Sequence, residues 1–133
     1  MKITVTSFGY LHGEPPAAHL TMDLRHHFRD PHVDPSLRAL TAEDRAVRRA
    51  VLRTPGIRPL LAATVAQALA YAAGPSAAQH SLRIAVGCAG GRHRAGTAAL
   101  VLARRLRRRG HDVTLVHRDL ARPVVERPRQ EQP

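Results

Sequence analysis

The stretch from Leu82 to Gly96, LRIAVGCAGGRHRAG, constrains the fold of this chain more than any other part of it. An apolar run typical of a buried strand ends at Cys88, a turn containing Gly90 and Gly91 follows, and an Ala- and Leu-rich helix is predicted to about Arg109. Glycine adopts positive φ easily and lets a ligand approach the backbone closely. A strand, a glycine turn and a helix start also bring backbone N–H groups and the positive end of a helix dipole to one point. The basic side chains beside the turn are Arg92, His93 and Arg94. The pattern therefore predicts a site for an anion, above all a phosphate.

Three other segments are predicted to be strands, at residues 2–8, 20–25 and 112–116. The strand, helix and strand between residues 82 and 116 form a βαβ unit, which implies a parallel pair of strands and a right-handed crossover. Ligands of such sheets bind beyond the carboxyl ends of the strands. The reactive or charged groups at predicted strand ends are Asp23 and Arg25, then Cys88 to Arg94, then His117, Arg118 and Asp119. We expect a small α/β domain with a mostly parallel sheet flanked by helices and a phosphate-binding turn between a strand end and a helix start.

Two helices are predicted between the second and third strands. Thr41, followed three residues later by an acid, suggests an N-cap, and the helix would end at Arg53 because a proline follows Thr54. A second helix is predicted over residues 57–73. The loop over residues 26–40 contains His26, His27 and His32, but neither HExxH nor a Cys/His ligand spacing is present, so no metal site is predicted.

A chain of 133 residues suits one domain. We expect that domain at residues 1–120, with a disordered tail at 121–133, where three prolines interrupt any apolar period. No apolar stretch is long enough to cross a membrane, which predicts no membrane partner. The single cysteine suits a reducing compartment and hence the cytoplasm. The residues indicate no cofactor.

The chain has a net charge of +11 and a pI near 11.6, a balance that attracts phosphates of nucleic acids or of small metabolites. The alternative is a general bias towards arginine, and it is supported by Lys2 being the only lysine. The helix after the glycine turn carries Arg104, Arg107 and Arg108 on its polar face. This face is either a solvated surface or an RNA-binding patch.

The segment from Cys88 to Arg94, CAGGRHR, also has the C-x5-R spacing of cysteine-dependent phosphatases. In that chemistry a thiolate attacks phosphorus, the arginine binds the phosphoryl oxygens, and a carboxylic acid such as Asp119 or Asp23 protonates the leaving group. Gly87 stands where a histidine often precedes the cysteine, and Ala95 where a hydroxyl residue often follows the arginine. A phosphatase using Cys88, Arg94 and Asp119 is the alternative function, beside the simpler one that Cys88 is a small buried residue.

Five segments in the same order resemble the C-terminal domain of the RapZ family of RNase adaptor proteins. These segments are SFGY at 7–10, DLR to DPH at 23–32, LRALTAED at 37–44, VGCAGGRHRAG at 86–96 and VHRDL at 116–120. They are spread over nearly the whole chain, from residue 7 to residue 120. The resemblance implies a non-catalytic domain that senses an amino-sugar phosphate such as glucosamine-6-phosphate and binds small regulatory RNAs.

The resemblance also implies a set of ligand-binding residues. By motif they are Asp23, Arg25, His32, Cys88, Gly90, Gly91, His93, Arg94, His117 and Arg118. The turn and Arg94 would hold the phosphate, Asp23 would pair with the ammonium of the sugar, and the histidines would add hydrogen bonds.

This sequence departs from the family pattern at three points. The G-x-x-x-x-G-K-[ST] motif of a P-loop domain is absent, so the chain resembles a free-standing C-terminal domain, and ATP or GTP binding is not carried over. Ala89 and Ala95 replace a threonine and a serine of the family turn, which removes two hydroxyl donors. The basic residues of the tail are only Arg122, Arg127 and Arg129, so RNA binding would depend on the arginines of the helix. Association into homo-oligomers stays open.

Overall fold

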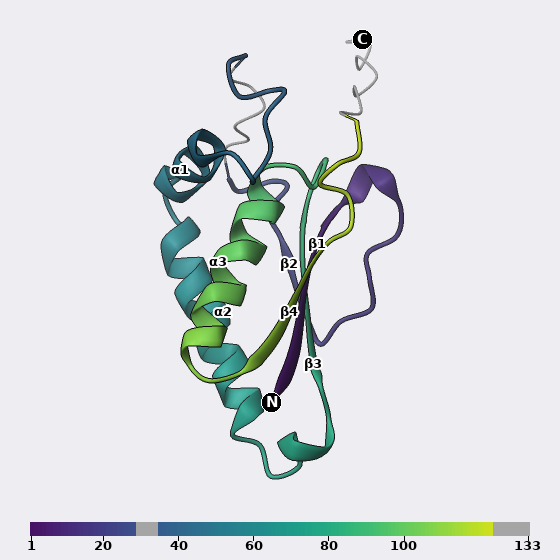
Figure 1. Ribbon diagram of the computed structural model, residues 1–133, viewed down its shortest axis with the longest axis vertical. Helices are drawn as coiled ribbons and strands as arrows, with labels where there is room; N and C mark the ends of the chain where they lie inside the picture. Colours follow the sequence, from purple (N-terminus) through teal and green to yellow (C-terminus); the bar gives the residue numbers. More distant parts are fainter. Residues whose placement is uncertain (29–34, 124–133) are drawn as a thin grey trace.

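The computed structural model describes residues 1–28 and 35–123 (Figure 1). His32 and the greater part of the predicted tail, residues 124–133, lie outside the described residues. The elements follow the order β1 (Lys2–Gly9), η1 (Tyr10–His12), β2 (Leu20–Asp23), α1 (Arg45–Arg53), α2 (Ile57–Ala72), η3 (Ala77–Gln79), β3 (Leu82–Cys88), α3 (Arg94–Arg108) and β4 (Asp112–His117).

The four strands form one sheet in the order β2-β3-β1-β4, and every pair is parallel. This confirms the predicted α/β class and the parallel βαβ unit around the glycine turn. All four carboxyl ends therefore meet at one edge of the sheet. Gly9 pairs with Cys88, Asp23 with Gly87, and Ser7 with His117, so the register sets which side chains are neighbours at that edge.

The three helices cover one face of the sheet (Figure 1). α3 contacts β1, β3 and β4, and α1 and α2 both pack on α3. The connection from β1 to β2 runs on the other face, where Leu11 N–H donates to Ala89 and His19 N–H donates to Arg83, both to main-chain oxygens at 3.1 and 2.9 Å. Among the described residues, the helices thus cover one face of the sheet and the connection from β1 to β2 lies on the other.

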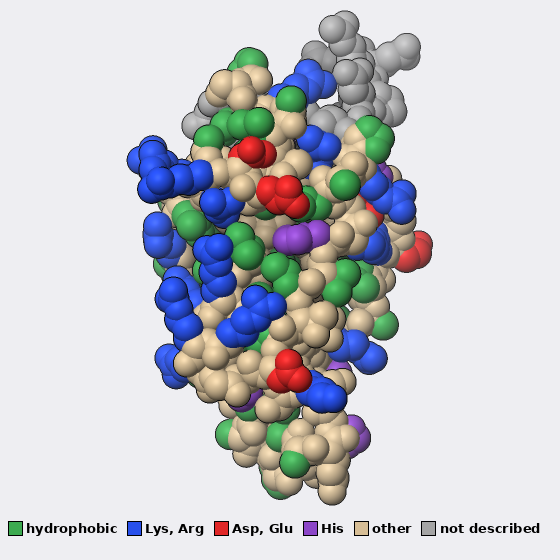
Figure 2. Space-filling model, in the orientation of Figure 1, with side chains coloured by type: hydrophobic (Ala, Val, Ile, Leu, Met, Phe, Trp, Pro, Cys, Tyr) green, Lys and Arg blue, Asp and Glu red, His purple; other side chains and the backbone are tan. Residues whose placement is uncertain are grey.

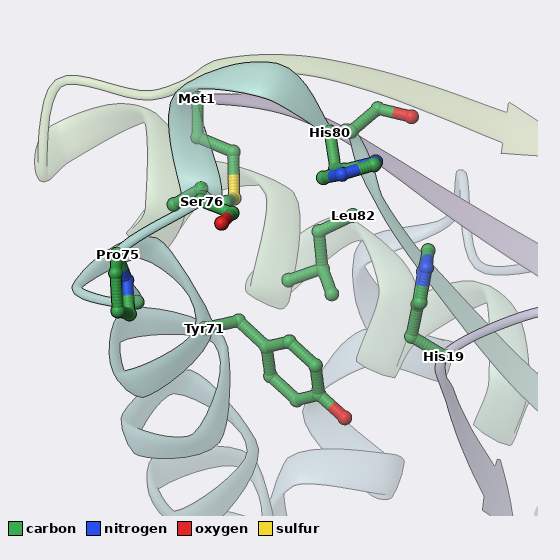
Figure 3. A pocket seen from close by; sticks show the side chains of 10 residues that line it. Met1, His19, Tyr71, Pro75, Ser76, His80 and Leu82 are labelled. Carbon is green, nitrogen blue, oxygen red and sulfur yellow. The ribbon is translucent and has the colours of Figure 1, made fainter.

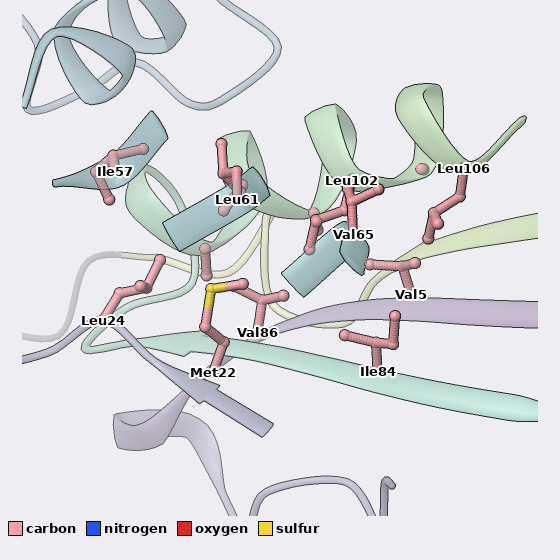
Figure 4. Packing of buried hydrophobic residues seen from close by; sticks show 14 of the residues in the cluster. Val5, Met22, Leu24, Ile57, Leu61, Val65, Ile84, Val86, Leu102 and Leu106 are labelled. Carbon is pink, nitrogen blue, oxygen red and sulfur yellow. The ribbon is translucent and has the colours of Figure 1, made fainter. Parts of the chain in front are cut away.

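The core lies between the helix layer and the sheet (Figure 4). Aliphatic side chains from α2 and α3 meet the inward-facing residues of the strands, and aromatic rings are absent from this cluster's fully buried members. The labelled members are Val5, Met22, Leu24, Ile57, Leu61, Val65, Ile84, Val86, Leu102 and Leu106. Burial of such side chains contributes about 1.5–3 kcal/mol each, and this layer fixes α3 and with it the glycine turn.

Several predicted boundaries differ from the structure by one or more residues. α1 begins at Arg45 with Asp44 as its N-cap, so the prediction that Thr41 caps the helix is wrong. The reciprocal contact exists, since the carboxylate of Asp44 accepts the N–H of Thr41 at 2.8 Å, but it closes a turn before the helix. The second strand ends at Asp23 rather than at residue 25, and α2 ends at Ala72.

Candidate functional site

Cys88 lies at the base of the turn between β3 and α3. Its Sγ accepts the N–H of Gly91 at 3.2 Å and that of Ala95 at 3.4 Å, and the residue is 2% exposed. Two backbone donors, one in the turn and one in the first turn of α3, thus hold the sulfur in place. The slight exposure of Cys88 leaves little of its sulfur surface open to an incoming phosphorus atom.

The two glycines of the turn serve different purposes. Gly91 has φ +78°, and a Cβ there would lie 2.8 Å from the backbone nitrogen of Gly9, so glycine is required by both conformation and space. A Cβ on Gly90 would meet nothing within 4 Å. Gly90 therefore borders open space within the turn that leads into α3. Backbone N–H groups at a helix start bind anions where such space lies beside them.

Arg94 ties the end of β2 to the turn. It is 3% exposed, and its Nη1 donates to the main-chain oxygens of Leu24 at 2.7 Å, Arg25 at 3.1 Å and Phe28 at 3.2 Å. Charge-assisted bonds to three carbonyls fix the chain that follows β2 against the start of α3. Arg94 therefore has a structural role that its place in the motif did not indicate.

Asp23 and Arg25 form an ion pair one strand away from the turn. Arg25 Nη2 lies 2.7 Å from Oδ2 of Asp23, and Nε lies 3.0 Å from Oδ1. The hydrogen bond from Arg25 lowers the pKa of Asp23, while the bond to Asp23 raises the pKa of Arg25. The carboxyl group is thus ionised at neutral pH.

Tyr10 supports this ion pair and was not predicted as a site residue. The guanidinium of Arg25 lies 3.5 Å from the centre of the Tyr10 ring, a cation–π contact. Burial, followed by the charge of Asp23, raises the pKa of Tyr10, so the phenol stays protonated. The aromatic residue of the SFGY segment was the available signal, but nothing in the spacing showed which strand end it would face.

Gly87 makes room for the aromatic side chains. A Cβ at this position would lie 2.5 Å from Cε2 of Tyr10 and would also overlap the ring of Phe8. The rings of Phe8 and Tyr10 pack edge to face with centroids 4.7 Å apart. The departure from the phosphatase pattern at Gly87 thus has a packing reason.

The segment before α1 closes the turn from the helix side. Ala42 N–H donates to the main-chain oxygen of Arg92 at 2.8 Å, and Nε2 of His93 lies 2.7 Å from the main-chain oxygen of Leu40. Arg92 donates to the main-chain oxygens of Ala39 and Arg122. The basic side chains on this flank bind the protein's own backbone.

His117 lies on the helix face of the sheet, two strands from β3 and so roughly 10 Å from it. Its Nδ1 is 2.6 Å from Oγ of Ser7, whose exposed fraction is 0%. Burial lowers the pKa of His117, and the charge of Glu43 opposes that shift. The structure therefore separates His117 from the pair formed by Asp23 and Arg25.

Asp119 is fully buried and acts as a link between β1 and the chain after β4. Its Oδ2 accepts the N–H of Gly9 at 2.8 Å and Nε of Arg118 at 3.0 Å, and Oδ1 lies 3.0 Å from Nε of Arg122. Arg118 also donates to the main-chain oxygens of Glu14 and Gly9 and lies over the ring of Phe8. Because its oxygens are engaged by these contacts, Asp119 is a structural carboxylate, and Arg118 is its ion-pair partner.

A hollow of about 350 Å³ lies at the opposite, amino end of the sheet (Figure 3). Its labelled walls include Tyr71, His19 and Leu82, and no lysine or arginine lines it. Without a fixed cation, this hollow does not suit a phosphate. Among the residues that the structure describes, no group of three His, Cys, Asp or Glu side chains could hold a metal ion. None of the described helices is long and apolar enough to cross a membrane.

Exposed arginines gather over the helix layer (Figure 2). Arg104, Arg107 and Arg108 are exposed on α3, as predicted. On α1 the exposed arginines are Arg45, Arg49 and Arg53. Since α1 packs against α3, both helices contribute to the same basic side of the molecule.

The fold and the turn define a class: a small, all-parallel α/β domain with a glycine turn at the carboxyl edge of its sheet. The sequence comparison is more specific, since residues 1–121 match the family described as the RapZ C-terminal domain. The chain belongs to this family.

Curated relatives carry the same domain within longer proteins. A nucleotide-binding protein of Thermobifida fusca is 40% identical over 123 residues, which is 92% of this chain and 42% of that protein. Nucleotide-binding protein RC1_2868 of Rhodospirillum centenum is 44% identical over 126 residues, 92% of this chain and 37% of that protein. Nucleotide-binding protein STH186 of Symbiobacterium thermophilum is 38% identical over 136 residues, 98% of this chain and 43% of that protein. The chain spans about two fifths of the length of these relatives.

Proposed function

We propose that this domain binds a phosphorylated metabolite, specifically an amino-sugar phosphate such as glucosamine-6-phosphate, and works in the cytoplasm as a sensor or adaptor rather than as an enzyme. The observation that carries this proposal is the open space at Gly90, in the turn that joins β3 to α3. β3 pairs with the strand that ends in Asp23. A phosphate would bind the backbone N–H groups of the turn, and an ammonium would bind the carboxylate of Asp23.

The family and the site support each other. Membership in the RapZ C-terminal domain family implies such a ligand, and the relatives are named for binding nucleotides, which are also phosphates. This chain has no G-x-x-x-x-G-K-[ST] motif, so we assign it a sugar phosphate rather than a nucleotide. His32, which lies outside the described residues, stays in the proposed ligand set because the family resemblance implies it. His93 is 4% exposed with Nε2 2.7 Å from the main-chain oxygen of Leu40, so His93 and Arg94 both act by fixing the backbone around the site.

The test is thermal stabilisation by glucosamine-6-phosphate, its N-acetyl form, glucose-6-phosphate, inorganic phosphate and ATP. A ligand at 100 times its dissociation constant adds about 2.7 kcal/mol to the free energy of unfolding. We expect the largest shift with glucosamine-6-phosphate, a smaller one in Gly90→Ala, whose Cβ enters the open space, and none in a variant carrying both Gly90→Ala and Asp23→Asn. Equal shifts with all five compounds, or no shift with any, would contradict the proposal.

The alternative is the phosphatase that uses Cys88, Arg94 and Asp119. The two N–H groups on Sγ favour it, but the commitment of Arg94 to three carbonyls and of Asp119 to Gly9 and two arginines does not. Phosphate release from glucosamine-6-phosphate that stops in Cys88→Ser would establish the phosphatase. We expect no release from either protein.

RNA binding is a second candidate function, favoured by the exposed arginines of α1 and α3. Such binding would weaken steeply with salt, since each neutralised phosphate contributes about −0.7 to the slope for single strands. Replacing Arg104 and Arg108 with glutamine would then reduce the magnitude of the slope by about 1.4 and leave the unfolding midpoint unchanged. Arg107 is kept, because its guanidinium donates to the main-chain oxygen of Val113 at 2.9 Å. A slope that does not change would show that this arginine face does not bind RNA.

A further inference from the structure

The proposed function assigns Asp23 to the ammonium of the ligand, yet its carboxylate already has a cation. Both oxygens bind the guanidinium of Arg25, at 3.0 Å from Nε and 2.7 Å from Nη2, and Oδ1 also accepts the Arg25 N–H at 2.9 Å. A bidentate pair of this kind uses the lone pairs that an ammonium would need. An amine can therefore reach Asp23 only when the guanidinium withdraws.

Separating this ion pair costs little free energy, because both side chains are partly exposed to solvent. The side chains of Arg25 and Asp23 are 33% and 36% exposed, so water solvates both charges when they separate. Exposed ion pairs are weak for this reason, whereas a buried pair would lock the carboxylate.

Tyr10 provides a contact that the guanidinium of Arg25 keeps after it separates from Asp23. The centre of its ring lies 3.5 Å from Cζ of Arg25. The ring packs against Phe8, in space that is open because Gly87 has no Cβ. The cation–π contact does not depend on Asp23, so Arg25 keeps one of its two partners during the exchange.

We infer that Arg25 is a specificity-determining residue: an internal cation that occupies the ammonium position at Asp23 and yields it only to a ligand that carries both a phosphate and a primary ammonium. This inference rests on the proposed function. A sugar phosphate without an amine binds the turn but leaves the ion pair closed, because it has nothing to exchange for the guanidinium.

The first experiment measures affinities by calorimetry at fixed ionic strength, for glucosamine-6-phosphate and glucose-6-phosphate, which differ only in the amine. Exposed ion pairs are weak, so the expected change in affinity is a factor of about 1.5 to 5. Arg25→Gln should bind glucosamine-6-phosphate more tightly by that factor and glucose-6-phosphate equally well. Asp23→Asn should lose the preference for the amine without losing glucose-6-phosphate.

The possible failures are distinct. Equal weakening of both sugar phosphates in Arg25→Gln would overturn the inference, because Arg25 would then bind the phosphate, and the proposed function would stand. Binding of neither compound by any of the proteins would overturn the proposed function and this inference with it.

A second experiment reports on Arg25 itself. The chain has two tyrosines and no tryptophan, so Tyr71→Phe, at the other end of the sheet, leaves Tyr10 as the only strong fluorophore. Glucosamine-6-phosphate should change its emission and glucose-6-phosphate should not, and Arg25→Gln should abolish the difference. The same change with both compounds would contradict the exchange.

Discussion

Replacement of Asp119 by alanine should lower the stability of the domain by about 3 kcal/mol. The carboxylate has an exposed fraction of 0% and accepts the buried N–H of Gly9 at 2.8 Å, so the substitution leaves that donor without a partner, at a cost of about 1–3 kcal/mol. The bonds from Arg118 and Arg122 are lost as well, but these side chains are 28% and 56% exposed and are rehydrated. We therefore assign the two arginines only about 1 kcal/mol together, at the level of exposed ion pairs.

The assay is thermal unfolding followed by circular dichroism. An unfolding entropy of about 2.1 cal/mol/K per residue over roughly 120 residues makes 1 kcal/mol equivalent to about 4 °C, so the midpoint should fall by about 12 °C. Asp119→Asn, which keeps an oxygen for Gly9, should lose less. A midpoint of Asp119→Ala within 2 °C of the parent protein would refute the structural role. If, against this expectation, the parent protein released phosphate and Asp119→Asn abolished that release at an unchanged midpoint, the carboxylate would be a general acid instead.

Two further perturbations test the geometry around the turn. Gly87→Ala should destabilise the fold by about 1–3 kcal/mol in chemical denaturation, because its Cβ would overlap the Phe8 and Tyr10 rings. Gly90→Ala is the control, since its Cβ would meet nothing within 4 Å, and it should unfold near the parent midpoint. Equal stabilities of the two variants would show that the rings do not pack as described. Since burial lowers the pKa of His117, the native state favours its neutral form, and the stabilisation present above the unfolded value of about 6.5 is lost as the pH falls through the lower folded value. His117→Asn, which keeps an acceptor near Oγ of Ser7 but does not titrate, should flatten the stability profile below pH 6.5, and a profile identical to that of the parent would contradict this assignment.

Much of the architecture follows from local sequence signals. The apolar run before Cys88, the glycines after it and the Ala- and Leu-rich segment beyond them predict a strand, a turn and a helix, because each preference is local to a few residues. The parallel pairing follows from this order, since a helix that connects two strands of one sheet usually joins parallel strands by a right-handed crossover. The start of α1 was misplaced by a few residues because an acid three positions after Thr41 closes an isolated turn as readily as a helix.

The sequence by itself determined the fold class, the family and the position of the turn at the carboxyl edge of the sheet. Only the tertiary structure decided what the charged residues at that edge bind. It turned Arg94 towards three carbonyls, paired Asp23 with Arg25 over Tyr10, and buried Asp119 beneath Gly9. The physical reason is that strand order and register bring together residues far apart in the chain, and a charged side chain takes whichever partner is nearest in space.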